Sequence, residues 1–116
     1  MRLISSIGEE NNQKMTLLLP DGKRFDLIMM YNFHQLGWFA SIIYSDKTIN
    51  NIRVSTSGNF LHQWRNILPF GLACIVEANQ EPTLQKDFSS GRAKMYTLGL
   101  LEVAAYSRLV SGQTTT

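Results

Sequence analysis

The stretch MTLLLPDGKRFDLIMMY, residues 15–31, decides the fold. It contains an apolar run, a Pro-Asp-Gly-Lys sequence and a second run in which apolar residues alternate with others. Asp-Gly between two apolar runs is the strongest short-range signal for a β-hairpin, because both central residues of a type I′ turn need a positive φ. We therefore expect two antiparallel strands joined at Asp21-Gly22 by a turn of this type.

The alternation within residues 24–31 predicts which side of the second strand faces the core. Successive side chains of a strand point to opposite faces of a sheet. One face carries Phe25, Leu27, Met29 and Tyr31, and the other carries Arg24, Asp26, Ile28 and Met30. The first face is apolar throughout, so we expect it to be buried.

The rest of the chain continues as short segments of strand character. Residues 38–44 are rich in aromatic and β-branched side chains, which favour a pleated surface. We expect further strands over residues 49–54, 72–77 and 91–98, and one or two helical turns over residues 60–68 that Pro69 ends. The prediction is an all-β, or mainly β, fold: a small antiparallel sheet or barrel of five to seven strands with one or two short helical segments.

At 116 residues the chain has the length of one domain. We expect a flexible N-terminal lead over residues 1–13, a β domain over residues 14–98 and a C-terminal extension over residues 99–116. The extension carries Leu101, Ala105 and Leu109 at helical spacing. This spacing predicts a short helix, and we expect a disordered tail from Ser111 onward.

Composition excludes several classes of protein. Charged residues make up 17% of the chain, against about 25% in typical soluble domains, so much of the surface is uncharged and suited to contact with other proteins. With 11 Lys and Arg against 9 Asp and Glu, the net charge of +2 does not indicate a nucleic-acid or membrane partner. A single cysteine, Cys74, excludes an internal disulfide and fits a reducing compartment. We expect no signal peptide and no transmembrane segment.

Residues that could carry chemistry are isolated from one another. His34 and His62 lie outside the spacings that bind metals, and Cys74 is expected to be a buried, inert thiol. We expect no enzyme activity, metal or cofactor, although an unrecognised enzyme would gather a histidine or a carboxylate in a pocket. The aromatic side chains expected to anchor the core or an interface are Tyr31, Phe33, Trp38 and Phe39.

A series of short motifs gives this sequence a likeness to a known family. In order they are Asp21-Gly22-Lys23-Arg24-Phe25, Met30-Tyr31-Asn32, Gly37-Trp38-Phe39, Tyr44-Ser45-Asp46, Gly58-Asn59-Phe60-Leu61, Pro69-Phe70-Gly71, Glu81-Pro82-Thr83 and Met95-Tyr96. Through this order the chain resembles the baseplate plug family of contractile-tailed bacteriophages over residues 14–98. Lys47 stands where that pattern has a glycine, and the chain beyond Leu98 extends past the similar part.

The resemblance implies a structural protein of the virion, made in the host cytoplasm and placed in the tail baseplate. There it would plug or adapt the junction between the tail tube and the hub or spike until the tail contracts. The implied partners are other baseplate and tail proteins, namely the hub, spike, tail tube and tape-measure protein, with the chain present in several copies and without nucleic acid or membrane. The alternative is a small β-barrel module that binds single-stranded nucleic acid or a small ligand. That mode needs aromatic rings beside a positive groove.

Overall fold

The structure, a computed structural model, describes residues 2–19 and 21–114, with the side chains of residue 79 and residues 110–114 excepted. The elements are β1 (Arg2–Ile4), β2 (Asn12–Leu18), β3 (Arg24–Asn32), β4 (Gly37–Tyr44), β5 (Lys47–Arg53), the 3₁₀ turn η1 (His62–Trp64), β6 (Gly71–Val76), the 3₁₀ turn η2 (Glu77–Asn79), β7 (Ala93–Leu98) and helix α1 (Leu100–Thr114). Seven strands in this part of the chain confirm the predicted mainly β fold.

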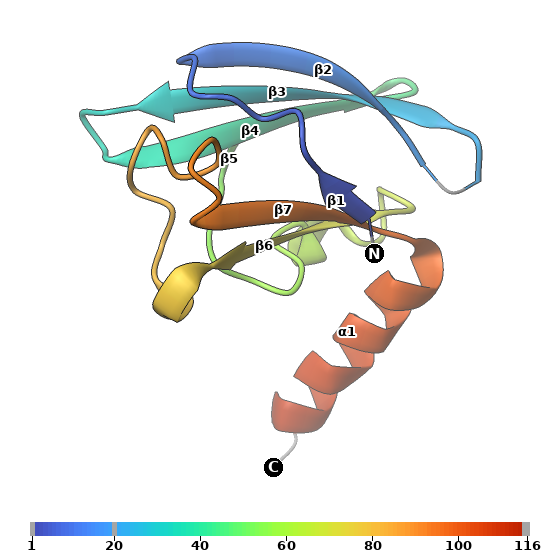
Figure 1. Ribbon diagram of the computed structural model, residues 1–116. Helices are drawn as coiled ribbons and strands as arrows, with labels where there is room; N and C mark the ends of the chain where they lie inside the picture. The colour runs from blue at the N-terminus through green and yellow to red at the C-terminus, as the bar shows by residue number, and fades with distance from the viewer. Residues whose placement is uncertain (1, 20, 115–116) are drawn as a thin grey trace.

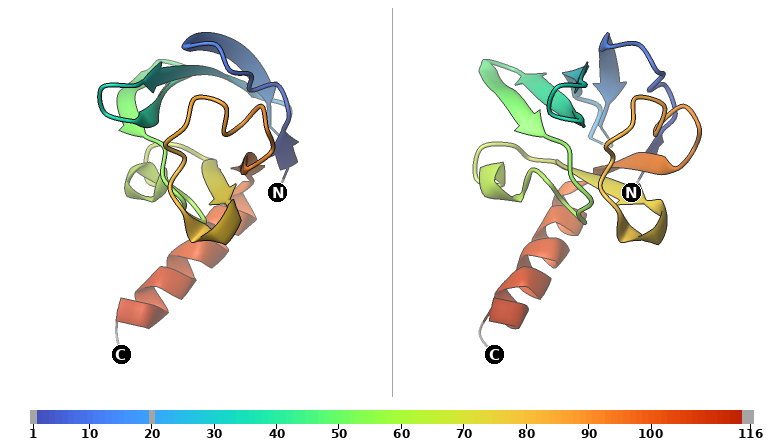
Figure 2. Two further views of the ribbon diagram at one scale, coloured as in Figure 1. Left: turned by 60° about the vertical axis from the view of Figure 1, so that its left-hand side comes forward. Right: turned by 90° about the vertical axis from the view of Figure 1, so that its left-hand side faces the viewer.

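The strands form two antiparallel sheets. The four-stranded sheet has the order β2-β3-β4-β5, and the three-stranded sheet has the order β1-β7-β6. The first sheet lies above the second in Figure 1, and the two views of Figure 2 show the sheets as separate layers with α1 extending away from both. A sheet that is apolar on one face is stable when that face is buried against another element.

The core lies between these layers, as the alternation in β3 predicts. Phe25, Leu27 and Met29 are at most 2% exposed. The ring of Phe25 stacks on that of Phe70, with 4.3 Å between centroids. Other buried members of the same cluster include Trp38, Ala40 and Ile42 from β4, Leu72 and Cys74 from β6, and Met95 from β7.

The predicted hairpin is confirmed, but its turn is not of type I′. Leu19 N–H donates to the Lys23 carbonyl at 2.7 Å, and Gly22 N–H donates to the Leu19 carbonyl at 3.0 Å. Three residues therefore separate the closing pair. Of the described turn residues only Gly22 has a positive φ, of 89°. A three-residue hairpin loop needs the left-handed conformation at a single position, which glycine supplies without steric cost.

The N-terminal segment is more ordered than the expected lead over residues 1–13. Arg2–Ile4 forms β1 and pairs with β7, and Ile4 and Ile7 are 7% and 6% exposed. Gln13 holds the following loop, since its side chain accepts from Gly8 N–H at 2.9 Å and donates to the Gly8 carbonyl at 2.8 Å. The expectation of a flexible lead is therefore wrong for residues 2–13. The isoleucines supply apolar surface, and β7 supplies the strand edge that pairs with β1.

The C-terminal extension forms a longer helix than expected. Helix α1 runs for 15 residues to Thr114, so it includes residues 111–114, where a disordered tail was predicted. Gly99 N–H donates to the Glu102 carboxylate at 3.1 Å, which satisfies an otherwise open donor at the start of the helix. Once a helix has begun, each further residue adds a hydrogen bond, and no proline stops it here. Residues 115–116 of the predicted tail lie outside the described residues.

Cys74 provides a test of the buried core. It is 0% exposed, and burial, followed by the negative charges of Glu81 and Asp87, raises the pKa of its thiol from 9.0 to about 12. Because the thiolate is the reactive form, we expect Ellman's reagent to leave native Cys74 unmodified at mildly alkaline pH and to react fully after unfolding in guanidinium chloride. Rapid reaction of the native protein would contradict this burial.

The same pKa shift gives stability a pH dependence. The unfolded thiol ionises near pH 9.0, whereas the folded thiol keeps its proton until about pH 12. The unfolded state therefore binds fewer protons in this window, and the free energy of unfolding falls as pH rises through it. Chemical denaturation at a series of pH values measures the fall, which should be smaller in Cys74→Ala.

Candidate interaction surfaces

Two of the four predicted anchors, Tyr31 and Trp38, point inward and hold a loop. Trp38 is 0% exposed, and its indole Nε1–H donates to the Leu84 carbonyl at 3.1 Å. The Tyr31 hydroxyl donates to the Thr83 carbonyl at 2.6 Å. These two rings contact each other edge to face, with 5.3 Å between centroids. They therefore fasten the loop of residues 80–92 to the four-stranded sheet and serve as core anchors.

This loop has its own internal support. Asp87 is 1% exposed and pairs with Arg92 at 2.8 Å. The Asp87 carboxylate also accepts a hydrogen bond from Leu84 N–H at 2.8 Å, and the backbone carbonyl of Asp87 accepts one from Ala93 N–H at 2.9 Å. Phe88 packs edge to face on Trp38 at 5.6 Å. Hydrophobic periodicity gives no sign of a buried ion pair, so this support could not be predicted from the sequence.

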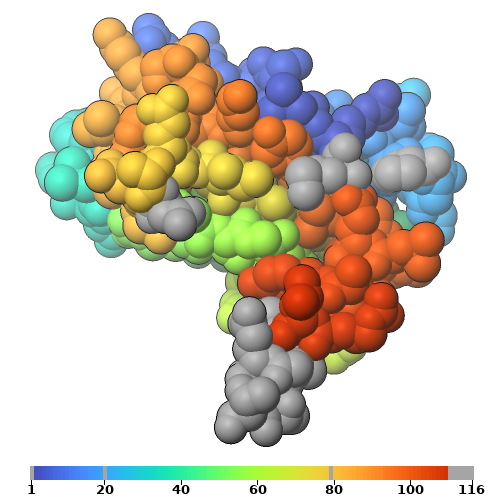
Figure 3. Space-filling model, turned by 60° about the horizontal axis from the view of Figure 1, so that its bottom comes forward, coloured from blue at the N-terminus to red at the C-terminus, as the bar shows by residue number. Residues whose placement is uncertain are grey.

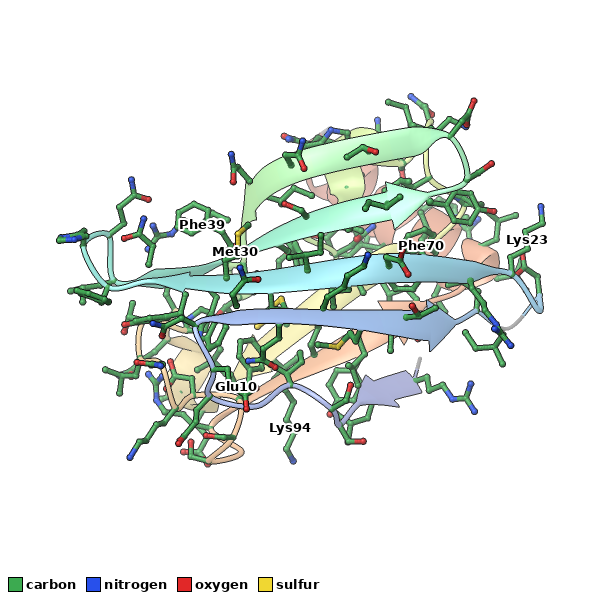
Figure 4. The ribbon with its side chains drawn as sticks, turned by 90° about the horizontal axis from the view of Figure 1, so that it is seen from above. Glu10, Lys23, Met30, Phe39, Phe70 and Lys94 are labelled. Carbon is green, nitrogen blue, oxygen red and sulfur yellow. The ribbon has the colours of Figure 1, made fainter. Side chains whose placement is uncertain are left out.

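The other two anchors, Phe33 and Phe39, lie outside the core. Phe33 is 60% exposed in the turn between β3 and β4, where its ring stacks on His34 at 5.0 Å. Phe39 is on the outer face of the four-stranded sheet, opposite Met30 of β3, as Figure 4 shows. The Arg53 guanidinium lies over the Phe39 ring, 5.6 Å from its centroid. The four aromatic residues therefore do not form one site.

This division predicts different costs of truncation. Trp38→Ala removes a fully buried ring and a hydrogen bond, so we expect the free energy of unfolding to fall by about 3–5 kcal/mol. Phe33→Ala changes an exposed side chain, and we expect a change within about 0.5 kcal/mol. Urea denaturation followed by circular dichroism measures both. Equal losses would contradict the assignment of Trp38 to the core and Phe33 to the surface.

The outer face of the four-stranded sheet carries an apolar patch. Its members are Ile28, Met30, Phe39 and Ile43, all of them half-buried, and we call them the outer-face patch. They occupy the outward positions of β3 and β4, which in a lone antiparallel sheet are usually polar. An open depression of about 360 Å³ is lined by Met30, Phe39 and polar neighbours.

Among the described side chains of helix α1, Val103 and Tyr106 pack against the body of the protein. Val103 is 5% exposed and belongs to a small cluster with Leu98 of β7. Tyr106 lies against Gly58, where an added Cβ would come within 2.7 Å of the tyrosine ring. The ring of Tyr106 also packs edge to face on His62 at 5.4 Å. These contacts fix which side of the helix faces the protein.

The opposite side of α1 is the predicted stripe of Leu101, Ala105 and Leu109, which we call the helix stripe. Leu101 is 86% exposed, Leu109 is 64% exposed, and Ala105 is also exposed. Figure 3 shows one side of α1, in orange to red, at the surface of the molecule. The helical spacing read from the sequence is therefore present, but the stripe faces solvent.

The titratable residues singled out from the sequence lie apart. His34 is exposed on the β3–β4 turn, His62 is half-buried beside α1, and Cys74 is buried in β6. Across residues 2–19 and 21–114, no group of three or more His, Cys, Asp or Glu side chains is placed to hold a metal ion. No helix in that part of the chain is both long enough and apolar enough to cross a membrane.

Comparison with known proteins adds no residue to these surfaces. No protein-family model matches the sequence, and no curated protein matches it significantly.

Proposed function

We propose that this chain is a non-catalytic structural subunit of a contractile phage tail baseplate, where it plugs or adapts the junction between the tail tube and the hub or spike. The observation that carries its role as an assembly subunit is the helix stripe, an apolar helix face turned away from the protein's own core. The placement in a baseplate rests on the order of sequence motifs between residues 14 and 98.

The helix stripe faces solvent, whereas the apolar side of a helix in an isolated domain is normally buried. A surface helix normally places its apolar side on the core and its polar side in water. In α1, Leu101 and Leu109 are both well exposed. Covering a leucine that was fully exposed is worth about 1.5–3 kcal/mol, so this face favours association with a second apolar surface. Its proposed occupant is the apolar face of a neighbouring tail or baseplate subunit.

Other features support contact with more than one neighbour. The outer-face patch lies on the four-stranded sheet, whereas the helix stripe lies beyond the three-stranded sheet (Figure 1). In the described strand order, β2 and β5 are the edges of the four-stranded sheet. An open edge presents unpaired N–H and C=O groups that can add a strand from another chain. A subunit with such surfaces on opposite sides suits a junction between two parts of an assembly.

Substitution of two leucines by lysine tests whether the helix stripe binds a partner. In Leu101→Lys/Leu109→Lys we expect the purified chain to fold with an unfolding free energy within about 0.5 kcal/mol per site of the wild type, because both positions are solvent-exposed. We expect its binding to the tail tube or hub protein to be lost, because each lysine would enter an apolar interface. Size-exclusion chromatography with light scattering measures the complex.

The matched control is Leu36→Lys/Leu84→Lys, which places the same two charges at exposed leucines outside α1, 56% and 57% exposed. This control should bind like the wild type. Removal of residues 99–116 should likewise weaken assembly more than folding. The proposal fails if the charged helix variant still joins the tail proteins, or if the wild type joins none of them.

A further inference from the structure

A basic cleft lies at one end of the molecule. It has an open volume of about 740 Å³ and is lined by residues of the β2–β3 turn, the β4–β5 turn, the segment after η1 and the start of α1. These four segments meet on the right-hand side of Figure 1, and Figure 4 labels Lys23 at the same end. Segments far apart in the sequence therefore meet around one opening.

The cations of the cleft are Lys23, Arg24, Lys47 and Arg65, all exposed. None of the described lining residues is acidic, and none of the four cations forms an ion pair within 4.0 Å with a described residue. Elsewhere Arg92 does pair with an aspartate. In a chain whose net charge is +2, four unpaired positive charges around one opening create a local field that attracts anions.

One of these cations is oriented by a hydrogen bond within its own turn. Arg65 Nη1 donates to the His62 carbonyl at 3.0 Å, so the guanidinium is held at the rim while its remaining donors stay available. A guanidinium held in this way can bind a carboxylate through two parallel hydrogen bonds.

The remaining lining of the cleft is aliphatic rather than aromatic. Ile67 is 47% exposed and Leu100 is 65% exposed, and Pro69 lies beside them. Tyr44 is the sole aromatic residue among the described lining, and at 8% exposure it offers no free ring face. Proteins that bind single strands of nucleic acid stack bases on exposed aromatic rings. This surface favours carboxylates next to aliphatic side chains instead.

We propose that the basic cleft binds an acidic segment of a partner protein, with Asp or Glu side chains on the four cations and an aliphatic side chain against Ile67 and Leu100. The inference rests on the proposed function in one respect, because it takes the protein to act by docking onto other chains. The inference adds that one partner carries an acidic segment with an aliphatic side chain. Because Leu100 begins α1, the cleft adjoins the element that carries the helix stripe.

Fluorescence anisotropy with the full-length chain tests the cleft directly. The probe is a fluorescein-labelled peptide of alternating Glu and Leu, compared with a Lys-Leu peptide and an oligo-dT strand. We expect the acidic peptide to bind, its affinity to fall as NaCl is raised, and the basic peptide to remain free. Failure of the acidic peptide to bind, or tighter binding of the oligo-dT strand, would overturn the proposal.

Charge reversal locates the binding site. In Lys47→Glu/Arg65→Glu we expect affinity for the acidic peptide to fall at least about tenfold, because two attractive contacts become repulsive. The control Lys86→Glu/Lys94→Glu makes the same change in net charge at exposed residues outside the cleft, and it should lose at most about twofold. The neutral variant Lys47→Gln/Arg65→Gln serves if the reversal unfolds the protein. Equal losses in the cleft and control variants would show binding to net charge alone and would sink the proposal.

The outcome is separable from that of the proposed function. A wild-type chain that joins tail proteins but ignores the acidic peptide would refute the cleft and leave the baseplate proposal standing. A chain that binds the peptide through Lys47 and Arg65 but joins no tail protein would refute the baseplate proposal and leave the cleft standing.

Discussion

The rest of the structure depends on the burial of the inner face of β3 and β4 against β6, β7 and the segment before β6. Phe70 is central to this contact, because it stacks on Phe25 at 4.3 Å and meets Tyr44 edge to face at 5.5 Å. A single cluster of buried side chains joins the two sheets and extends to Phe88 of the loop of residues 80–92. Interiors of this kind are close-packed, so a change at one position is felt across both sheets.

Some apolar side chains lie outside this core. The inward positions of both sheets cover one another, while the outer-face patch and the helix stripe remain on the outside. Scattered apolar residues on a surface need no explanation, but apolar residues that line one side of a helix are a recognised sign of a binding surface. The basic cleft lies at one end of the molecule, where two turns of the four-stranded sheet and the segment after η1 meet the start of α1. In the proposed function, folding and contact with partners therefore depend on different side chains, which is the arrangement expected of a subunit that is rigid before it assembles.

Much of the core could be predicted, because the alternation in β3 is a local property of consecutive residues. The type of the hairpin turn could not be predicted. A type I′ turn has two residues between its closing pair, and the Asp-Gly sequence does not reveal that three residues separate Leu19 from Lys23 here. Strand β1 was missed because Arg2–Ile4 is only three residues long and owes its pairing to β7, more than ninety residues away. The helix stripe has a visible period, but its direction is set by the docking of Val103 and Tyr106. The basic cleft has no local signature, because the fold alone brings its cations together.

We expect the two sheets to unfold as one cooperative core, with α1 extending from it as the proposed surface for partners. Native-state hydrogen exchange of the isolated chain tests it most directly. The account predicts that amides of β3, β4, β6 and β7 share the highest protection, equal to the free energy of global unfolding, and that amides of α1 exchange through openings of much lower free energy. Separate protection levels for the two sheets, or an α1 as protected as the core, would contradict it.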